Sequence, residues 1–282
     1  MDQNRIMVTV PEETKRQLER RWEKAGIGDD FIFSCVMRKE EFFLPLMQRI
    51  FPEMKLCRVE KHIPQMTVYG AAGAKSVRYD VYSEIDGRAF DVEMQMHSRD
   101  NEPKRTRYYQ CLMDEQVLNM GQDYSKLPES CIIMISPKDI FGKGRHIYRF
   151  RNIETTDRNL ELGDGTMKVF LNTLGTDTDI LPELKNFLDL VNGEKPADDY
   201  CRAVAREVES AKMNAEVRRD FMEFEYLRKL DRIDGKAEGK REAFASLVQD
   251  GTLTLSEAAT RSGLSEEDLK NYMNKENKKK EI

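Results

Sequence analysis

The sequence predicts an α/β protein of the α+β type, in which helices flank a β-sheet and a helical extension follows toward the C-terminus. Residues 76–96 alternate between apolar and polar side chains around Asp86-Gly87, a dipeptide that strongly marks a tight hairpin. The apolar run at 131–135 stops before Pro137, as expected of a short buried strand. Strand patterns cease near Gly175, and the later segments have helical patterns.

Two helices are predicted before the hairpin. Residues 11–25 begin with Pro, are almost wholly charged and stop at Gly26, so we predict an exposed helix. Residues 29–51 begin with aspartates that can cap a helix, and their apolar side chains recur at helical spacing. We predict one core-facing helix here, bent by Pro45, and then a connection that contains Pro and Gly.

The rest of the chain continues with mixed elements and then with helices. We predict a helix at 103–120, with Pro near its start and Gly121 as its stop. Strands are predicted at 131–135, 146–153 and 167–174, and helices at 181–191, from 198 to about 240, and twice more beyond.

The predicted domains are an N-terminal helix at 1–28, a core at 29–195 and a helical C-terminal extension at 196–282. Within the extension, GKAEGK at 235–240 is the predicted flexible joint, and the lysine-rich tail is predicted to be frayed.

Composition narrows the classes of function. The five cysteines are scattered without a CxxC pair, which favours a reduced cytoplasmic location and disfavours a zinc site. The sequence has no apolar run near the roughly 20 residues of a membrane span, and its first residues lack the apolar core of a secretion signal, so we expect no membrane partner. A net charge of −5 argues against a protein that coats nucleic acid.

The hairpin brings two acids together. If Asp86-Gly87 is a two-residue turn, Ile85 faces Arg88 and Asp80 lies opposite Glu93. Alternation then places Tyr79, Val81, Phe90, Val92, Met94 and Met96 on a core face, and Arg78, Asp80, Tyr82, Glu84, Asp91, Glu93 and Gln95 on the other.

Facing carboxylates have Cβ atoms about 4.5 to 5.5 Å apart and repel each other. A hard divalent cation would offset the repulsion, and so would a proton shared between the two acids, which raises one pKa. The alternative for this pair is an ordinary exposed polar face of a hairpin.

These residues resemble a known motif. Asp80 followed by Glu93-Met94-Gln95 is similar to the PD-(D/E)XK nuclease motif, with Gln at the usual Lys position and Tyr79 in place of the Pro. More of the chain, over roughly residues 29–150, resembles the PD-(D/E)XK nuclease family transposases, which are similar to recombination-promoting nucleases. The segments that carry this resemblance are DDFIF at 29–33, Lys75 before VRYDV, DVEMQ, RTRYYQ and GQDYSKLP. The resemblance implies a restriction-endonuclease-like core, at 29–195, with a mixed central β-sheet flanked by helices.

The resemblance also implies a site. Asp80, Glu93 and the backbone carbonyl of Met94 would hold Mg²⁺ or Mn²⁺, and the reaction would be hydrolysis of a DNA phosphodiester. Gln95 can hydrogen-bond a water but supplies no positive charge and does not readily act as a base. This departure from the motif argues against efficient catalysis, although the branch that this sequence resembles commonly carries Gln at this position.

Further candidates surround this core. Nucleases of this fold often bring an acid from the first helix toward the metal, which makes Glu40 a catalytic candidate; the alternatives are that Glu40 reaches solvent or that Glu41 is the relevant acid. For contacts to DNA phosphates we select Lys75, Lys104, Arg105 and Arg107. An ordinary solvated helix end explains the last three as well.

The function predicted from the sequence is a metal-dependent DNA endonuclease, linked to recombination or mobile elements. Its alternative is a catalytically weak or inactive nuclease-fold protein that acts as a DNA-binding or protein-interaction adaptor, which Gln95 and the acidic net charge favour. A third possibility is a scaffold that forms homo-oligomers through the C-terminal helices. The sequence has no GxSxG elbow, GxxxxGK[ST] loop or HExxH helix.

Overall fold

The computed structural model describes residues 11–70, 75–96, 101–118 and 120–280, with 275–280 described by their backbone alone. One compact unit comprises residues 21–218, and a second comprises residues 219–282 together with the chain up to Arg20. The domain boundaries derived from the sequence stay a prediction.

The larger unit is built on a six-stranded sheet within the described residues, in the order β1-β2-β3-β4-β6-β5. Pairing is parallel between β3 and β4 and between β4 and β6, and antiparallel elsewhere, so the sheet is mixed as predicted. The strands are β1 (Val59–Val68), β2 (Val77–Ile85), β3 (Arg88–Met94), β4 (Ser130–Ser136), β5 (Ile147–Phe150) and β6 (Thr166–Asn172).

Strand β1 lies in the segment that was predicted to be a connection. Pro64 obscures it in the sequence, because proline cannot donate to a ladder and argues against a central strand. The structure resolves the conflict by placing β1 at the edge of the sheet, where proline is tolerated.

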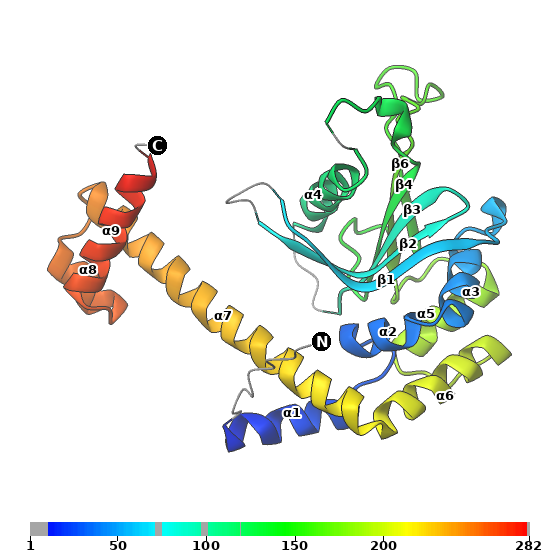
Figure 1. Ribbon diagram of the computed structural model, residues 1–282, viewed down its shortest axis with the longest axis horizontal. Helices are drawn as coiled ribbons and strands as arrows, with labels where there is room; N and C mark the ends of the chain where they lie inside the picture. Colours follow the sequence, from blue (N-terminus) through cyan, green and yellow to red (C-terminus); the bar gives the residue numbers. More distant parts are fainter. Residues whose placement is uncertain (1–10, 71–74, 97–100, 119, 281–282) are drawn as a thin grey trace. The chain divides into compact units, whose positions relative to one another are not determined.

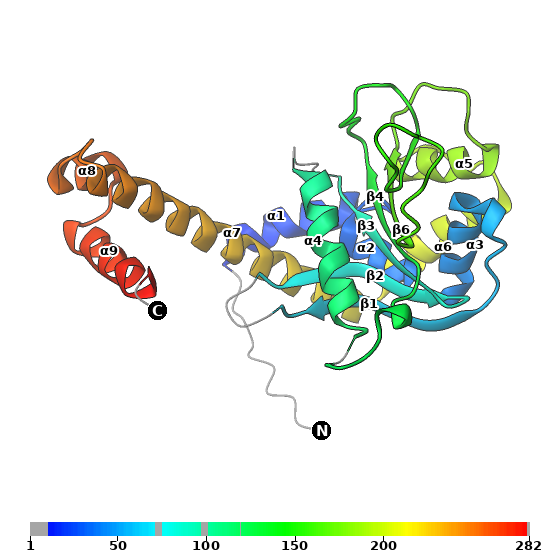
Figure 2. The same ribbon diagram turned by 90° about the horizontal axis from the view of Figure 1, so that it is seen from above.

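Helices cover both faces of this sheet (Figures 1 and 2). Helix α4 (Glu102–Glu115) packs on one face, while α2 (Asp30–Met37), α3 (Glu40–Ile50), α5 (Pro182–Val191) and α6 (Asp199–Met213) gather on the opposite face. Both sides of the central strands are therefore buried, and every residue of β4 is.

Two of the predicted helices differ from the structure. Residues 29–51 form α2 and α3 rather than one bent helix, because Lys39 adopts an extended conformation (φ −89°, ψ 121°) at the start of α3. Pro45 lies inside α3. Helix α4 ends at Glu115, five residues before the predicted end, so Gly121 is not its stop. Short 3₁₀ turns lie at Pro52–Met54 and Tyr124–Lys126.

The hairpin has the predicted register. Asp86 (φ 48°) and Gly87 (φ 73°) both have the positive φ of a type I′ turn, and Ile85 faces Arg88. The assignment of a single core face was wrong, since Tyr82, Asp91 and Glu93 on the other face are also buried, under α4. Strict alternation also fails, because Tyr79 and Tyr82, three residues apart, join the same core cluster.

The smaller unit is helical. It includes most of α7 (Ala215–Gln249), which buries Phe221 and Ala245, as well as α8 (Leu255–Ser262) and α9 (Glu266–Lys280). Within it, Lys229 of α7 donates to the Thr14 hydroxyl of α1 (Glu12–Lys24) at 3.1 Å.

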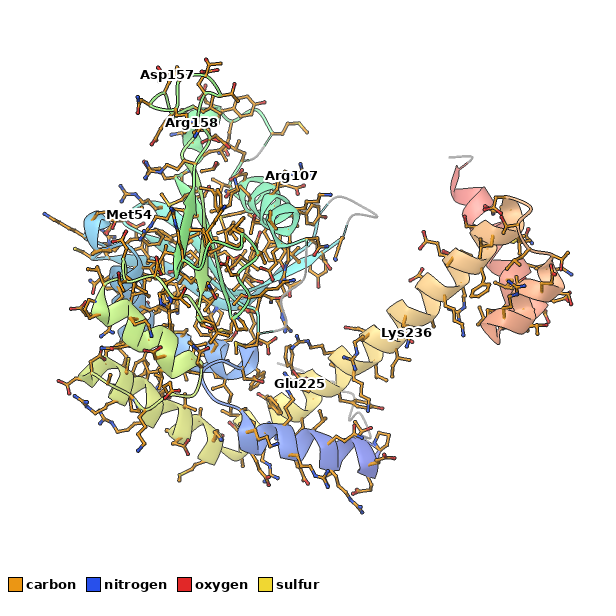
Figure 3. The ribbon with its side chains drawn as sticks, turned by 180° about the vertical axis from the view of Figure 1, so that it is seen from behind. Met54, Arg107, Asp157, Arg158, Glu225 and Lys236 are labelled. Carbon is orange, nitrogen blue, oxygen red and sulfur yellow. The ribbon has the colours of Figure 1, made fainter. Side chains whose placement is uncertain are left out.

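The flexible joint predicted at 235–240 was wrong, because α7 runs through it without a break, as Figure 3 shows around Lys236. Two glycines cost a helix about 1 kcal/mol each relative to alanine, and the Ala, Glu, Lys and Arg residues around them are good helix formers. Helix α9 reaches Lys280, into the tail predicted to be frayed. Across the described ranges, no helix is both long and apolar enough to span a membrane.

Candidate metal centre

Asp80 and Glu93 lie next to each other, and each reaches across to the backbone of the opposite strand. The Asp80 amide donates to Glu93 Oε1 at 2.9 Å, and the Met94 amide donates to Asp80 Oδ2 at 2.9 Å. The regular register of β2 and β3 ends one pair earlier, at Val81 and Val92, so these two bonds replace the ladder at the site. The reciprocal bonds fix both carboxylates at one position.

The backbone around Asp80 is held from two further elements. The Ser34 hydroxyl of α2 donates to the Asp80 carbonyl at 3.2 Å. On β1, the pairing with β2 passes from Pro64–Val81 directly to Met66–Tyr79, and Gln65 between them has a positive φ of 53°. The alternation predicted from the sequence breaks at the same point, where Tyr79 packs against Tyr109 of α4.

A third carboxyl, Asp91, lies behind the pair. Asp91 and Glu93 are both fully buried, and Asp80 is 9% exposed. No amide, hydroxyl or cationic group among the described residues donates to Asp91. Its carboxyl is within hydrogen-bonding reach of Glu93, a contact that forms only when one of the two acids holds a proton.

Burial raises the pKa of all three acids, and for Asp80 and Asp91 the negative charges of neighbouring acids raise it further. For Asp80 burial is the main cause, and the negative charges of Glu93 and Asp30 add to it. For Asp91, burial raises the pKa well above its ordinary value, and so do Glu93 and Asp80. For Glu93, burial also raises the pKa, although the ion pair with Arg105 opposes the shift. The site therefore holds more negative charge than its single guanidinium balances.

Arg105 of α4 contacts the motif directly. Its Nη2 donates to Glu93 Oε2 at 2.6 Å, and its Nη1 donates to Gln95 Oε1 at 2.7 Å. The Gln95 amide nitrogen in turn donates to the Met94 carbonyl at 3.2 Å. The arginine neutralises Glu93 but makes no ion pair with Asp80 among the described contacts.

The oxygen atoms available here suit a hard divalent cation. Asp80 Oδ1 accepts no hydrogen bond from the described residues, and Glu93 and the Met94 carbonyl each have lone pairs to spare. Carboxylate and carbonyl oxygens are the ligands that Mg²⁺ and Mn²⁺ prefer. In the described part of the chain no three His, Cys, Asp or Glu side chains converge on one metal position, so a set of two acids and one carbonyl fits better than three acids.

The sequence-based candidates divide into two groups. The structure brings together Asp80, Glu93, Met94, Gln95 and Arg105. The side chains of Glu40, Lys75, Lys104 and Arg107 are exposed. No described contact joins Glu40, in the first turn of α3, to either acid; the helix acid whose charge acts on both is Asp30, at the start of α2. Figure 3 shows Arg107 on α4.

Asp91, Asp30 and Tyr109 were not selected from the sequence. Asp91 could have been found, because it lies two residues before Glu93 on the same face. Asp30 belongs to DDFIF, which the resemblance had already marked. Tyr109 likewise belongs to RTRYYQ, which the resemblance had marked, but its contact with Arg105 depends on how α4 crosses the sheet.

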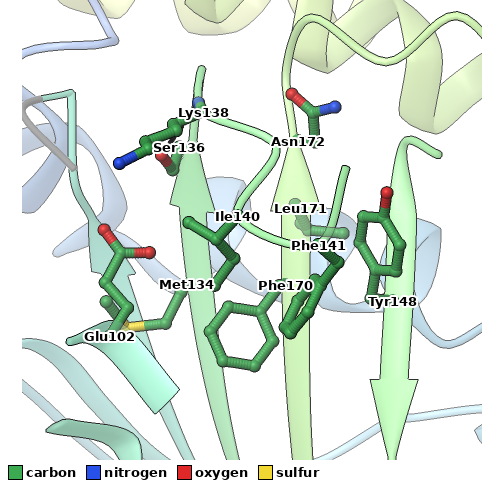
Figure 4. A pocket seen from close by; sticks show the side chains of 10 residues that line it. All are labelled: Glu102, Met134, Ser136, Lys138, Ile140, Phe141, Tyr148, Phe170, Leu171 and Asn172. Atoms are coloured by element: carbon green, nitrogen blue, oxygen red, sulfur yellow. Dashed lines mark hydrogen bonds between the residues drawn. The ribbon is translucent and has the colours of Figure 1, made fainter. Parts of the chain in front are cut away.

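A small pocket lies beside the site, lined by Met134, the β4 partner of Glu93, and by Glu102, Ser136 and Lys138 (Figure 4). Its volume of about 10 Å³ holds at most one water molecule, so it is not a substrate pocket.

Comparison with known proteins gives one match. The family model described as PD-(D/E)XK nuclease family transposase matches residues 63–173, which contain both acids, Gln95 and Arg105. The resemblance drawn from the sequence over roughly residues 29–150 is confirmed where the two ranges overlap, and the restriction-endonuclease-like fold class is confirmed with it. No curated protein and no solved structure matches the chain.

Proposed function

We propose that the protein is a divalent-metal-dependent endonuclease that hydrolyses DNA phosphodiester bonds. The match over residues 63–173 indicates a PD-(D/E)XK nuclease, a class that generally uses divalent metals and acts on DNA. The observation that carries the proposal is the buried acid cluster, in which Asp80 and Glu93 are fixed side by side at a cost that a divalent cation would offset.

Asp80, Glu93 and the Met94 carbonyl would hold Mg²⁺ or Mn²⁺. When bound, the metal polarises the phosphate and lowers the pKa of an attacking water. Asp80 and Glu93 are held in place by the two backbone amides, so they are preorganised for this role. The Gln95 amide, fixed between Arg105 and the Met94 carbonyl, can orient a water but cannot take its proton at neutral pH.

Plasmid nicking tests the proposal. Purified protein should convert supercoiled DNA to nicked circles with Mg²⁺ or Mn²⁺ and not with EDTA. Asp80→Asn and Glu93→Gln should each reduce the rate by more than about 100-fold, because even groups that only support a metal ligand contribute 10- to 100-fold. Glu129→Gln, an exposed acid paired with Arg88, is the matched control and should retain full activity.

The same assay addresses the alternative. A catalytically inactive adaptor is favoured by one observation, the ion pair that already joins Arg105 to Glu93. It predicts DNA binding without nicking under any metal condition. Equal nicking by wild type and Glu93→Gln would refute the endonuclease proposal.

Further parts of the proposal concern context. A role in recombination or mobile elements rests on the family description, and a cytoplasmic location fits five cysteines that are all free. Exposed Lys75, Lys104 and Arg107 would contact DNA phosphates. We also propose a homo-oligomer through the C-terminal helices, because α7 exposes Leu227, Leu230 and Ile233 at intervals of three residues.

A further inference from the structure

The motif of this chain lacks the positive charge that lysine supplies in the usual PD-(D/E)XK motif, and the structure places another cation next to that position. Arg105 comes from the first turns of α4, not from the hairpin. Its two terminal nitrogens bond separately to Gln95 and Glu93, at 2.7 and 2.6 Å. The guanidinium therefore lies one hydrogen bond beyond the side chain that occupies the lysine position.

The orientation of Arg105 is fixed by Tyr109, one helical turn later. The guanidinium carbon lies 4.7 Å from the centre of the Tyr109 ring, and the tyrosine hydroxyl accepts a hydrogen bond from Arg105 Nη2. Tyr109 is held by its carbonyl, which accepts from the Tyr79 hydroxyl at 3.0 Å. Since Tyr79 precedes Asp80, both ends of the site are linked through one chain of contacts.

Within the described part of the chain, Arg105 also has N–H donors that make no hydrogen bond. A guanidinium carries five N–H groups, and the contacts to Gln95, Glu93 and Tyr109 use three of them. The side chain is 24% exposed, whereas its partner Glu93 is fully buried. The arginine therefore reaches the boundary between the buried acids and solvent, where a phosphate from DNA would arrive.

We propose that Arg105 is a catalytic residue that supplies the positive charge which lysine supplies in the usual motif. This inference rests on the proposed function. In the hydrolysis, the water oxygen bonds to phosphorus, the bond from phosphorus to one ester oxygen breaks, and a proton from the water ends on the departing oxygen. Arg105 gains and loses no bond or proton; it donates hydrogen bonds to a non-bridging oxygen as its negative charge grows.

The chemistry of arginine limits its role. A guanidinium stays protonated at all pH values of interest, so Arg105 cannot remove the proton of the water. It differs in this from a lysine, which can lose its proton when buried. Arg105 therefore stabilises charge and does not act as a base.

The test compares a variant that removes the positive charge of Arg105 with a double variant that places a positive charge at position 95 instead. Arg105→Gln should lower the nicking rate at saturating Mn²⁺ by about 100-fold or more. Placing lysine at the motif position in that background, as Gln95→Lys with Arg105→Gln, should recover at least about tenfold of the loss, because the charge returns to the site. Arg158→Gln, an exposed arginine labelled in Figure 3, is the control and should leave the rate unchanged.

A second readout does not depend on activity. Titration with Mn²⁺, followed by electron paramagnetic resonance, should show that Arg105→Gln binds the ion about tenfold more tightly, because a positive charge beside Glu93 is gone. Tighter metal binding with slower nicking supports the proposal. A purely structural role would weaken metal binding and nicking together.

If the wild type nicks DNA, three results would overturn the inference. If Arg105→Gln binds Mn²⁺ more tightly and nicks DNA as fast as the wild type, Arg105 only competes with the metal for Glu93. Loss of both Mn²⁺ binding and nicking would make it structural, and failure of Gln95→Lys to restore any rate would separate it from the lysine position. A wild-type protein that nicks under no metal condition refutes the proposed function, and this inference with it.

Discussion

Asp91→Asn should make the metal-free protein more stable as the pH rises from 6 to 8, although it alters a fully buried carboxyl group of the site. Asp91 is fully buried, and burial together with Glu93 and Asp80 raises its pKa above the ordinary value of 3.8. An acid whose pKa is higher in the folded than in the unfolded chain does not reduce the free energy of unfolding at pH values below its unfolded pKa. Its cost to folding grows as the pH rises from there to the folded pKa.

The size of the effect follows from proton linkage. Between the two pKa values the folded protein retains a proton that the unfolded chain has lost, so the free energy of unfolding falls by about 1.4 kcal/mol per pH unit. This loss continues until the pH passes the raised pKa of the folded protein. Asparagine has no proton to lose, and its amide can donate to Glu93, so the variant escapes this loss.

Urea unfolding in EDTA at pH 6, 7 and 8 measures the difference. The free energy of unfolding of Asp91→Asn should exceed that of wild type, by an amount that increases with pH. Asp179→Asn, an exposed aspartate, should follow the wild-type curve. Parallel curves for wild type and Asp91→Asn, or a variant that is less stable at pH 8, would show that the buried acids do not hold the proton and would refute the reasoning.

Two other predictions can be tested on the same protein. Mn²⁺ at a hundred times its dissociation constant should raise the free energy of unfolding of the wild type by about 2.7 kcal/mol. It should also reduce the dependence of that free energy on pH, because the ion favours the ionised acids. EDTA should reverse both effects, and Asp80→Asn should show neither. In light scattering, the wild type should be larger than a monomer and Leu230→Glu on α7 should be monomeric; a monomeric wild type at every concentration would rule out the proposed oligomer.

The turn chemistry made the hairpin predictable. Asp86 and Gly87 accept the positive φ values of a type I′ turn, and this local preference sets the register of both strands and the position of Asp80 opposite Glu93. Nothing distant in the chain enters that inference. The same holds for the buried strand at 130–136, whose apolar run is short and is bounded by a proline.

The faces of the hairpin were not predictable in the same way. A row of polar side chains at Asp80, Asp91 and Glu93 favours a solvent-exposed face, because buried carboxylates are costly without partners. The structure buries all three acids, with Arg105 of α4 bonded to Glu93 and Ser34 of α2 bonded to the Asp80 carbonyl. The sequence pattern of a strand does not reveal which helices cover it. The displaced Tyr79 depends likewise on contacts from α4 and on the irregular backbone of β1.

The position of α4 gives a structural reason for glutamine, in place of lysine, at position 95. A lysine there would bring an ammonium up to the Arg105 guanidinium and would offer it no acceptor, whereas the Gln95 carbonyl oxygen accepts its hydrogen bond. Glutamine and arginine therefore form one matched arrangement, in which the neutral residue holds the charged one near the acids. In the sequence motif, glutamine at position 95 means that the positive charge of lysine is missing. In the folded chain, Arg105 of α4 provides a positive charge next to the same position. Whether a nuclease fold of this kind is active should be judged from the cations that reach Glu93 in space and not from the residue at the motif position alone.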